Sequence, residues 1–430
     1  MKNIFKLFFL TFVSSILIVS CTKEEYLNPS QATESTVVKD VNGLIALANG
    51  LQYRYSVSRT SPIYSYITAN ALTTNEWLVL NQGNTDEANL QAGKGNVIGN
   101  NAVVSRLWEQ CNLVKSSANL IINNLGFVGD TATRNGLICY ANLYKGLSLL
   151  QLGTFWEQAP INVGKAATFS PRAEVLAEAV SLFESGLTAS SKATFSSGLQ
   201  GGIDFPSTFN ALIARTYLML NNYDKAFAAA NKVDLTKKSE FTFDAVSKNP
   251  IFETHYSNVN VCEPVDNKLG LTGALAPDAT DGRLLFYLKS LTFTTTANEG
   301  KGFFTSNVDK IPLYLPGEII LIKAECLARN NDVPGAITEL NKVLTKKTDI
   351  FNVNANLSDY SGAVDKDAVL LQIYKNRCIE LFNSGLKLDD SRRFGRPGPT
   401  DAGAERNRNF YPYPNSERDN NPNTPADPSI

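Results

Sequence analysis

Residues 211–233, ALIARTYLMLNNYDKAFAAANKV, and residues 320–343, ILIKAECLARNNDVPGAITELNKV, follow one template. With Ala214 placed opposite Ala324, each copy has small residues twelve positions apart, on either side of a polar turn. The further matches are Asn221-Asn222 with Asn331-Asp332, Ala226 with Ala336, and Asn231-Lys232-Val233 with Asn341-Lys342-Val343. Antiparallel helices approach closely where their facing side chains are small. Each copy is therefore predicted to be a helix pair packed as in a tetratricopeptide repeat.

Other stretches show the same helical spacing of apolar residues. They cover residues 41–56, 104–125, 137–152 and 171–187. Gly126 and Gly153 are expected to end the second and third stretches, and Ser170 followed by Pro171 to begin the fourth. The sequence thus predicts a mainly α fold, with helix pairs at about 104–152, 171–233 and 316–394.

Two segments lack this periodicity and are interpreted as loop-rich, ligand-facing insertions. Residues 57–101 are rich in Ser, Thr, Asn and Gly, and residues 241–315 carry short β-prone runs such as 291–295. Loops of this length in a compact domain are usually functional. No long linker divides the chain, so residues 41–430 are predicted to form a single domain with a few short strands.

The first residues have the layout of a bacterial lipoprotein signal. Residues 1–20 combine two lysines with an apolar run too short to span a bilayer, and Cys21 ends it after Ile18-Val19-Ser20. This pattern resembles a lipobox, which predicts that Cys21 is lipidated and that residues 21–40 form a tether. Thr22-Lys23-Glu24-Glu25 looks like the surface-export signal of Bacteroidetes lipoproteins.

The composition removes several function classes. Forty basic and 41 acidic residues give a net charge of −1, which does not favour nucleic acid or an anionic membrane surface. The chain has no P-loop, Rossmann glycine motif, EF-hand loop or Cys-x-x-Cys pair, so no cofactor, zinc site or disulfide framework is expected. The single histidine, His255, is interpreted as an ordinary loop residue. Two-carboxylate hydrolysis stays open, although no spacing singles out a pair.

Several later motifs occur in a fixed order and together carry a family resemblance. They are Leu27-Asn28-Pro29 after Cys21, Thr280-Asp281-Gly282-Arg283-Leu284, Glu318 to Glu325, Arg377 to Leu381 with Gly385 and Asp389, Ser391 to Gly395, Tyr413 to Glu417, and Asn421-Pro422-Asn423. On these residues the chain resembles the SusD/RagB family of outer-membrane nutrient-binding lipoproteins. Ser384 and Lys387 depart from the pattern, which usually has an acid and an arginine there, and this weakens a local charge pair.

The resemblance implies a scaffold of tetratricopeptide-like helix pairs whose loops bind an oligosaccharide, or a peptide in some members. It also implies a non-enzymatic protein that is lipid-anchored at the outer membrane and faces the cell exterior. Its expected partner is a SusC-like TonB-dependent transporter, to which it delivers the nutrient. Two other functions stay open: a scaffold for envelope assembly without a small ligand, and a hydrolase.

The predicted ligand site centres on Trp77, since aromatic rings stack on sugar faces while amides and acids bind hydroxyls. The predicted ligand-binding residues are Asn75, Glu76, Trp77, Asn81, Gln82, Tyr256, Phe303 and Phe304. Trp77→Ala should then abolish glycan binding without unfolding the protein; the alternative is that Trp77 packs its segment onto the scaffold. Trp108 and Trp156 are interpreted as structural.

The closing residues 409–430 are predicted to be an extended segment laid across the helices. Pro412 and Pro414 keep the backbone extended, so Phe410, Tyr411 and Tyr413 can alternate between burial and solvent. These rings are assigned to packing, and truncation at Asn409 should destabilise the whole domain. The identity of the glycan or peptide is left open.

Overall fold

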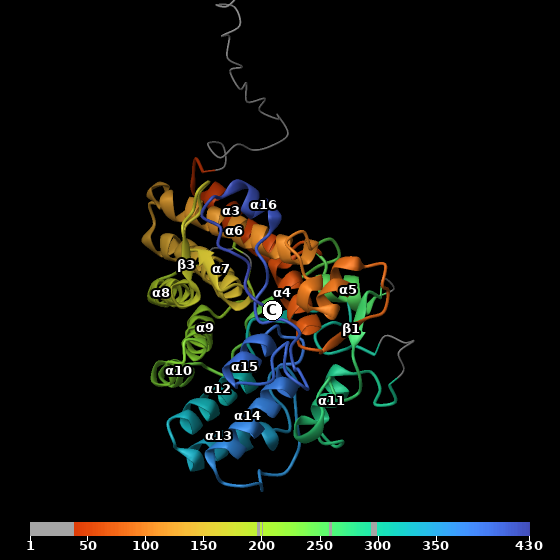
Figure 1. Cartoon of the computed structure of the whole chain (residues 1–430). Helices are drawn as coiled ribbons and strands as arrows, with labels where there is room; N and C mark the ends of the chain where they lie inside the picture. Colours follow the sequence, from red (N-terminus) through yellow and green to blue (C-terminus); the bar gives the residue numbers. More distant parts are fainter. Residues whose placement is uncertain (1–37, 196–197, 200, 258–259, 294–298) are drawn as a thin grey trace, which may run out of the picture.

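The structure is a computed structural model, and it describes residues 38–195, 198–199, 201–257, 260–293 and 299–430. Its long helices form a stack in which each helix contacts the next (Figure 1). They are α6 (Ala102–Asn123), α7 (Thr131–Phe155), α8 (Arg172–Ser190), α9 (Phe205–Met219), α10 (Tyr223–Ala230), α12 (Pro316–Arg329), α13 (Val333–Leu344) and α14 (Lys366–Glu380). The predicted mainly α class and its helix pairs are confirmed.

The two template copies form the pairs α9–α10 and α12–α13. All four aligned alanines are completely buried: Ala214, Ala226, Ala324 and Ala336. Both turns place an asparagine in the left-handed region, Asn221 at φ 56° and Asn331 at φ 67°. Asparagine tolerates this conformation better than other residues with a Cβ. The repeated Asn is therefore part of the turn geometry.

The remaining helix predictions hold with shifted ends. The stretch 41–56 is α3 (Val41–Ser56), and Asp40 caps it by accepting a hydrogen bond from the Gly43 amide. α7 runs through Gly153 to Phe155 instead of stopping at the glycine. A Cβ on Gly153 would lie 2.9 Å from Leu176 Cδ2 of α8, so the glycine allows close helix packing.

Two other expected helix ends also differ. Gly126 does not cap α6; the cap is Asn124, and Gly126 lies in the short 3-10 turn η2 (Leu125–Phe127). Pro171 occupies the cap position of α8 itself, and Ser170 belongs to a short strand.

The expectation that residues 57–101 are mostly loop is wrong. They hold α4 (Pro62–Thr73), β1 (Trp77–Val79), α5 (Thr85–Ala92) and the 3-10 turn η1 (Lys94–Asn96). Every residue of α4 is buried, so it lacks the one-sided apolar stripe by which surface helices are recognised. Several of its polar side chains have partners, although the Ser65 hydroxyl has none; Asn70, for example, donates to the Gly385 carbonyl at 2.6 Å.

The described part of residues 241–315 is loop-rich, as predicted. Its elements are short: η3 (Phe252–Tyr256, a π-helical turn), β5 (Cys262–Pro264), the 3-10 turn η4 (Gly273–Leu275), α11 (Gly282–Tyr287) and β6 (Ile311–Pro312). β5 pairs antiparallel with β1, and β6 pairs with β4 (Glu240–Phe241). The third two-stranded sheet is a hairpin of β2 (Gln158–Pro160) and β3 (Phe169–Pro171). Residues 291–293 are not in a strand, and the rest of that β-prone run lies outside the described residues.

The chain ends by crossing back over its first helices, where the blue C-terminal segment lies beside α3, α4 and α6 in Figure 1. Tyr411 and Tyr413 are buried, and the Tyr411 amide donates to the Phe155 carbonyl at 2.8 Å. Phe410 is half-buried against the guanidinium of Arg392, 4.3 Å from its ring centre. The predicted packing of these rings is confirmed, whereas part of the segment is helical, as α16 (Asn415–Asn420).

The structural role predicted for two of the tryptophans is confirmed. Trp108 and Trp156 are buried and pack edge to face, with ring centres 4.9 Å apart. Their indole N–H groups hold the closing segment, Trp156 by donating to the Pro412 carbonyl and Trp108 to Glu417 Oε2.

The charged residues of the sequence motifs form buried ion pairs between helices. Arg283 pairs with Asp281 and Glu380, and all three side chains are at most 1% exposed. Similar pairs link Arg377 with Asp390, Arg393 with Glu325 and Asp390, Arg215 with Glu318, and Arg172 and Arg392 with Asp389. Removing one partner of a buried pair leaves an uncompensated charge, which is strongly destabilising. These motifs therefore hold the scaffold together.

Candidate functional site beside helix α14

The structure contradicts the prediction that Trp77 presents its ring to a ligand. Trp77 is 0% exposed, and its ring packs against His255 and Tyr256, with centroid distances of 4.6 and 5.8 Å. Tyr256 and Phe304 are also buried and pack on each other. The alternative, that Trp77 fixes its segment to the scaffold, describes what the structure contains.

His255 is a core residue and not the loop residue expected. Its ring stacks on Tyr64 with centroids 5.2 Å apart, and its Nε2 lies 3.0 Å from the Thr68 hydroxyl. Burial lowers the pKa of His255 well below its usual range, so the ring is neutral. A neutral histidine can be enclosed without the cost of burying a charge.

The other predicted residues are not brought together in one site. Asn81 and Gln82 are exposed in the turn after β1, where their amides hydrogen-bond to nearby backbone. Phe303 is half-buried against Phe286 and Phe351. The remaining two, Asn75 and Glu76, lie beside the second of the two pockets described below, and Asn75 lines it.

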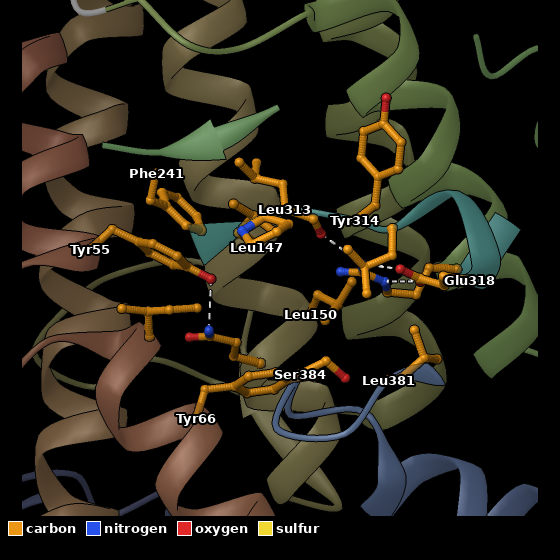
Figure 2. Close-up of a pocket in the computed structure, with 15 residues that line it drawn as sticks. Tyr55, Tyr66, Leu147, Leu150, Phe241, Leu313, Tyr314, Glu318, Leu381 and Ser384 are labelled. Carbon is orange, nitrogen blue, oxygen red and sulfur yellow. Dashed lines mark hydrogen bonds and ion pairs between the residues drawn. The ribbon is translucent and has the colours of Figure 1, made fainter. Parts of the chain in front are cut away.

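A small cavity lies between α3, α7, α9 and the strand pair β4–β6 (Figure 2). Its wall holds the Arg215–Glu318 ion pair and Tyr55, whose hydroxyl accepts a 2.6 Å hydrogen bond from Gln151. Its volume of about 50 Å³ suits a few water molecules. Small-molecule sites typically measure about 300–1,000 Å³. This cavity is therefore part of the scaffold and is too small to hold an oligosaccharide.

Two larger pockets open where residues 270–283 lie over α14. Both η4 and α11, at the two ends of this segment, contact that helix. Gly270 brings the segment close, since a Cβ at this position would collide with the carbonyl oxygen of Asn75. Its φ of 74° is in the left-handed region that favours glycine. The predicted insertion 241–315 thus contributes a wall to each pocket.

The first pocket, called the polar pocket here, has a volume of about 550 Å³. Its lining includes Asp278, Thr280, Tyr360, Ser361, Gln372 and Lys375. Gln372 and Lys375 come from α14, and Tyr360 from the segment that precedes it. Amide, hydroxyl and charged groups next to one aromatic ring form the side-chain set that binds sugar hydroxyls and a sugar face.

The second pocket, called the Lys387 pocket, has a volume of about 560 Å³. Its lining includes Asn75, Thr272, Lys387, Arg396, Ala404 and Glu405. Lys387 begins α15 (Lys387–Arg393), and Arg396 and Glu405 belong to the loop that follows this helix. Apart from Asn75, none of these side chains was among the predicted ligand residues. Lys387 had been noted only as a departure from the family pattern.

Glu76 lies behind this pocket and is 1% exposed. Burial raises the pKa of its carboxyl to about 7, and the positive charge of Lys387 acts in the opposite direction. The described residues contain no group of three or more His, Cys, Asp and Glu side chains placed to hold a metal ion, and no helix with the length and hydropathy of a bilayer span.

Solved structures share this architecture. A SusD superfamily protein from Bacteroides vulgatus matches 90% of this chain and 99% of its own, with a TM-score of 0.69 and 14% identity. The chain has a SusD-like fold. A SusD-like carbohydrate binding protein from the same organism matches at TM-score 0.69, with 17% identity over 89% of this chain and 97% of its own.

A SusD-like carbohydrate binding protein from Bacteroides fragilis matches the SusD-like fold as well. It covers 91% of this chain and 99% of its own at TM-score 0.67 and 15% identity. No family model and no curated protein matches the sequence. The resemblance read from the sequence is therefore confirmed at the level of the fold.

Proposed function

We propose that this protein captures an oligosaccharide at the cell surface and delivers it to a SusC-like TonB-dependent transporter in the outer membrane. The observation that carries the proposal is the SusD-like fold, shared over about nine-tenths of the chain with proteins described as carbohydrate binding. In this proposal the protein binds its ligand without catalysing a reaction. Cys21, which lies outside the described residues, carries the lipid that anchors it.

The two pockets support binding of a sugar. Their volumes of about 550 and 560 Å³ lie within the range of small-molecule sites. The segment 270–283 and α14 contribute residues to both linings, and we therefore infer that one oligosaccharide occupies both pockets. Tyr360 is the aromatic residue of the two linings, and we assign it the role of stacking on a sugar face.

A glycan array with the purified mature protein tests the proposal, followed by titration calorimetry on the glycans that bind. Tyr360→Ala should lower the affinity roughly tenfold, since aromatic contacts contribute about 1 kcal/mol beyond buried area. Tyr53→Ala is the matched control, because Tyr53 is 56% exposed on α3 and lines neither pocket. An array without any bound glycan, together with co-purification of envelope proteins other than a transporter, would favour the envelope-assembly function.

A further inference from the structure

Lys387 is a mostly buried cation that forms no direct ion pair with a described carboxylate. The residue is 5% exposed, and it lines the pocket named after it. Many arginines and lysines of the described chain make hydrogen bonds and ion pairs, but the Lys387 ammonium makes neither with a described residue. Ser384, three residues earlier, carries no charge that could compensate it. The Lys387 ammonium is not one of the fully enclosed polar atoms that lack a partner, so it is reached by solvent from the pocket that it lines.

The other charges at this pocket are already paired or withdrawn. Arg396 donates from Nε and Nη2 to Glu405 Oε1 at 2.9 and 2.5 Å. The second oxygen of Glu405 accepts a 2.8 Å hydrogen bond from the Tyr374 hydroxyl. Glu76 lies behind the pocket and makes no ion pair with Lys387, and burial favours its uncharged form. The pocket therefore keeps a net positive charge at Lys387.

We propose that the Lys387 pocket binds the anionic group, a carboxylate or a sulfate, of an acidic oligosaccharide. The proposal deepens the proposed function and rests on it, because it names the class of glycan. Lys387 supplies a charge-assisted hydrogen bond to the anion, which is stronger than a bond between neutral groups. Asn75 and Thr272, both exposed on the pocket wall, supply polar groups for the sugar hydroxyls.

The absence of an aromatic ring from this lining fits the same assignment. A neutral pyranose gains much of its affinity by stacking a face on a ring, whereas an anionic sugar gains it from a buried cation. The polar pocket, with Tyr360, suits a neutral unit next to the acidic one. The two pockets then bind different parts of one chain.

The experiment compares ligands that carry anionic groups with one in which the carboxylates are esterified and uncharged. Titration calorimetry of the full mature protein would use tetragalacturonate, its methyl ester, and a galactotetraose sulfated at O6. The carboxylate or the sulfate compound should bind roughly tenfold or more tightly than the methyl ester. Whichever of the two is preferred identifies the anion. The preference should shrink as salt is raised, because the interaction is ionic.

Variants then assign the preference to one residue. Lys387→Met should remove it, and Lys387→Arg should keep most of it. Lys347→Met, which removes an exposed lysine that lines neither pocket, should leave the preference unchanged. Glu76→Gln removes the carboxyl behind the pocket and should strengthen the preference above pH 7, where that carboxyl ionises. Circular dichroism would check that each variant is folded.

The outcomes separate this inference from the proposed function. If neutral glycans bind and neither anionic ligand binds more tightly than the methyl ester, the inference is wrong while the proposed function stands. If no glycan of any charge binds, the proposed function fails and the inference fails with it. The comparison of ligands on the unmodified protein tests the preference for an anionic group even if Lys387→Met does not fold. If a folded Lys387→Met variant still prefers the anionic ligand, the inference is also wrong.

Discussion

Glu76 shows how one buried carboxyl can make stability depend on pH. Its pKa is about 7 in the folded protein against an ordinary value of 4.5, so the folded state holds its proton more strongly than the unfolded chain does. Stability contributed by this group is therefore full below pH 4.5 and falls as pH rises to about 7. A difference of this size corresponds to about 3 kcal/mol.

Glu76→Gln should remove that loss. Urea unfolding of the variant and the parent, measured from pH 4 to 8, should show the variant gaining relative stability between pH 4.5 and 7, up to about 3 kcal/mol. Glu174→Gln, at an exposed position of α8, is the control and should give a difference that does not vary with pH. A flat difference for Glu76→Gln as well would mean that Glu76 is ionised in the folded state.

Because Trp77 is buried, Trp77→Ala should lower the stability of the folded protein. Removing a completely buried indole leaves a cavity between His255 and Tyr256, which costs about 3–5 kcal/mol. Thermal and urea unfolding would measure this loss. A variant that melts like the parent but no longer binds glycan would restore the original prediction of a ligand-stacking Trp77.

The site could be predicted from the sequence only in part, for a physical reason visible at Trp77. Polar neighbours such as Asn75 and Asn81 made its segment look solvent-exposed. The ring is nevertheless covered, because β1 pairs with β5 about 185 positions further along the chain. Such pairing is non-local and leaves no periodic signal. The burial of Lys387 was equally unpredictable, since the sequence around a lysine at the start of a helix does not indicate that it is buried.

At the scale of elements, the helix pairs were predictable because small residues and turn asparagines repeat at fixed spacing. α4 was not, since a helix buried on all sides has no amphipathic period. The buried ion pairs also fix how helices pack, because Arg283 and Arg377 of the sequence motifs link α11, α14 and α15. Their residue types were visible in the sequence, but their partners were not.

Ala336→Leu tests the small-residue packing of α12 against α13. Ala336 is completely buried opposite α12, so three additional carbons must displace neighbouring side chains at a cost of about 1–3 kcal/mol. Thr338→Leu, two positions along on the exposed face of α13, is the matched control and should change stability by less than about 0.5 kcal/mol. Equal effects in urea unfolding would show that close helix approach does not depend on Ala336.

At the scale of the whole molecule, the closing segment joins the end of the chain to its first helices. Removal of residues 410–430 exposes the surface that Tyr411 and Tyr413 cover, and it breaks the hydrogen bond to Phe155. The expected loss is at least about 5 kcal/mol, enough to unfold a marginally stable domain. A chain that lacks only the exposed residues 429–430 is the control. Calorimetry should show a cooperative transition for the control and none for the longer truncation.

The contact between the closing segment and α4 also affects the order in which the parts of the molecule can fold. The hydroxyls of Thr73 and Tyr411 hydrogen-bond although 338 residues separate them in the chain. A ribosome supplies Thr73 long before Tyr411, so this face of α4 stays uncovered until the closing segment has been synthesised. Contacts of such long range slow folding and leave incomplete chains open to proteases. Chains that lack the closing segment therefore expose this surface to cellular proteases until that segment is in place.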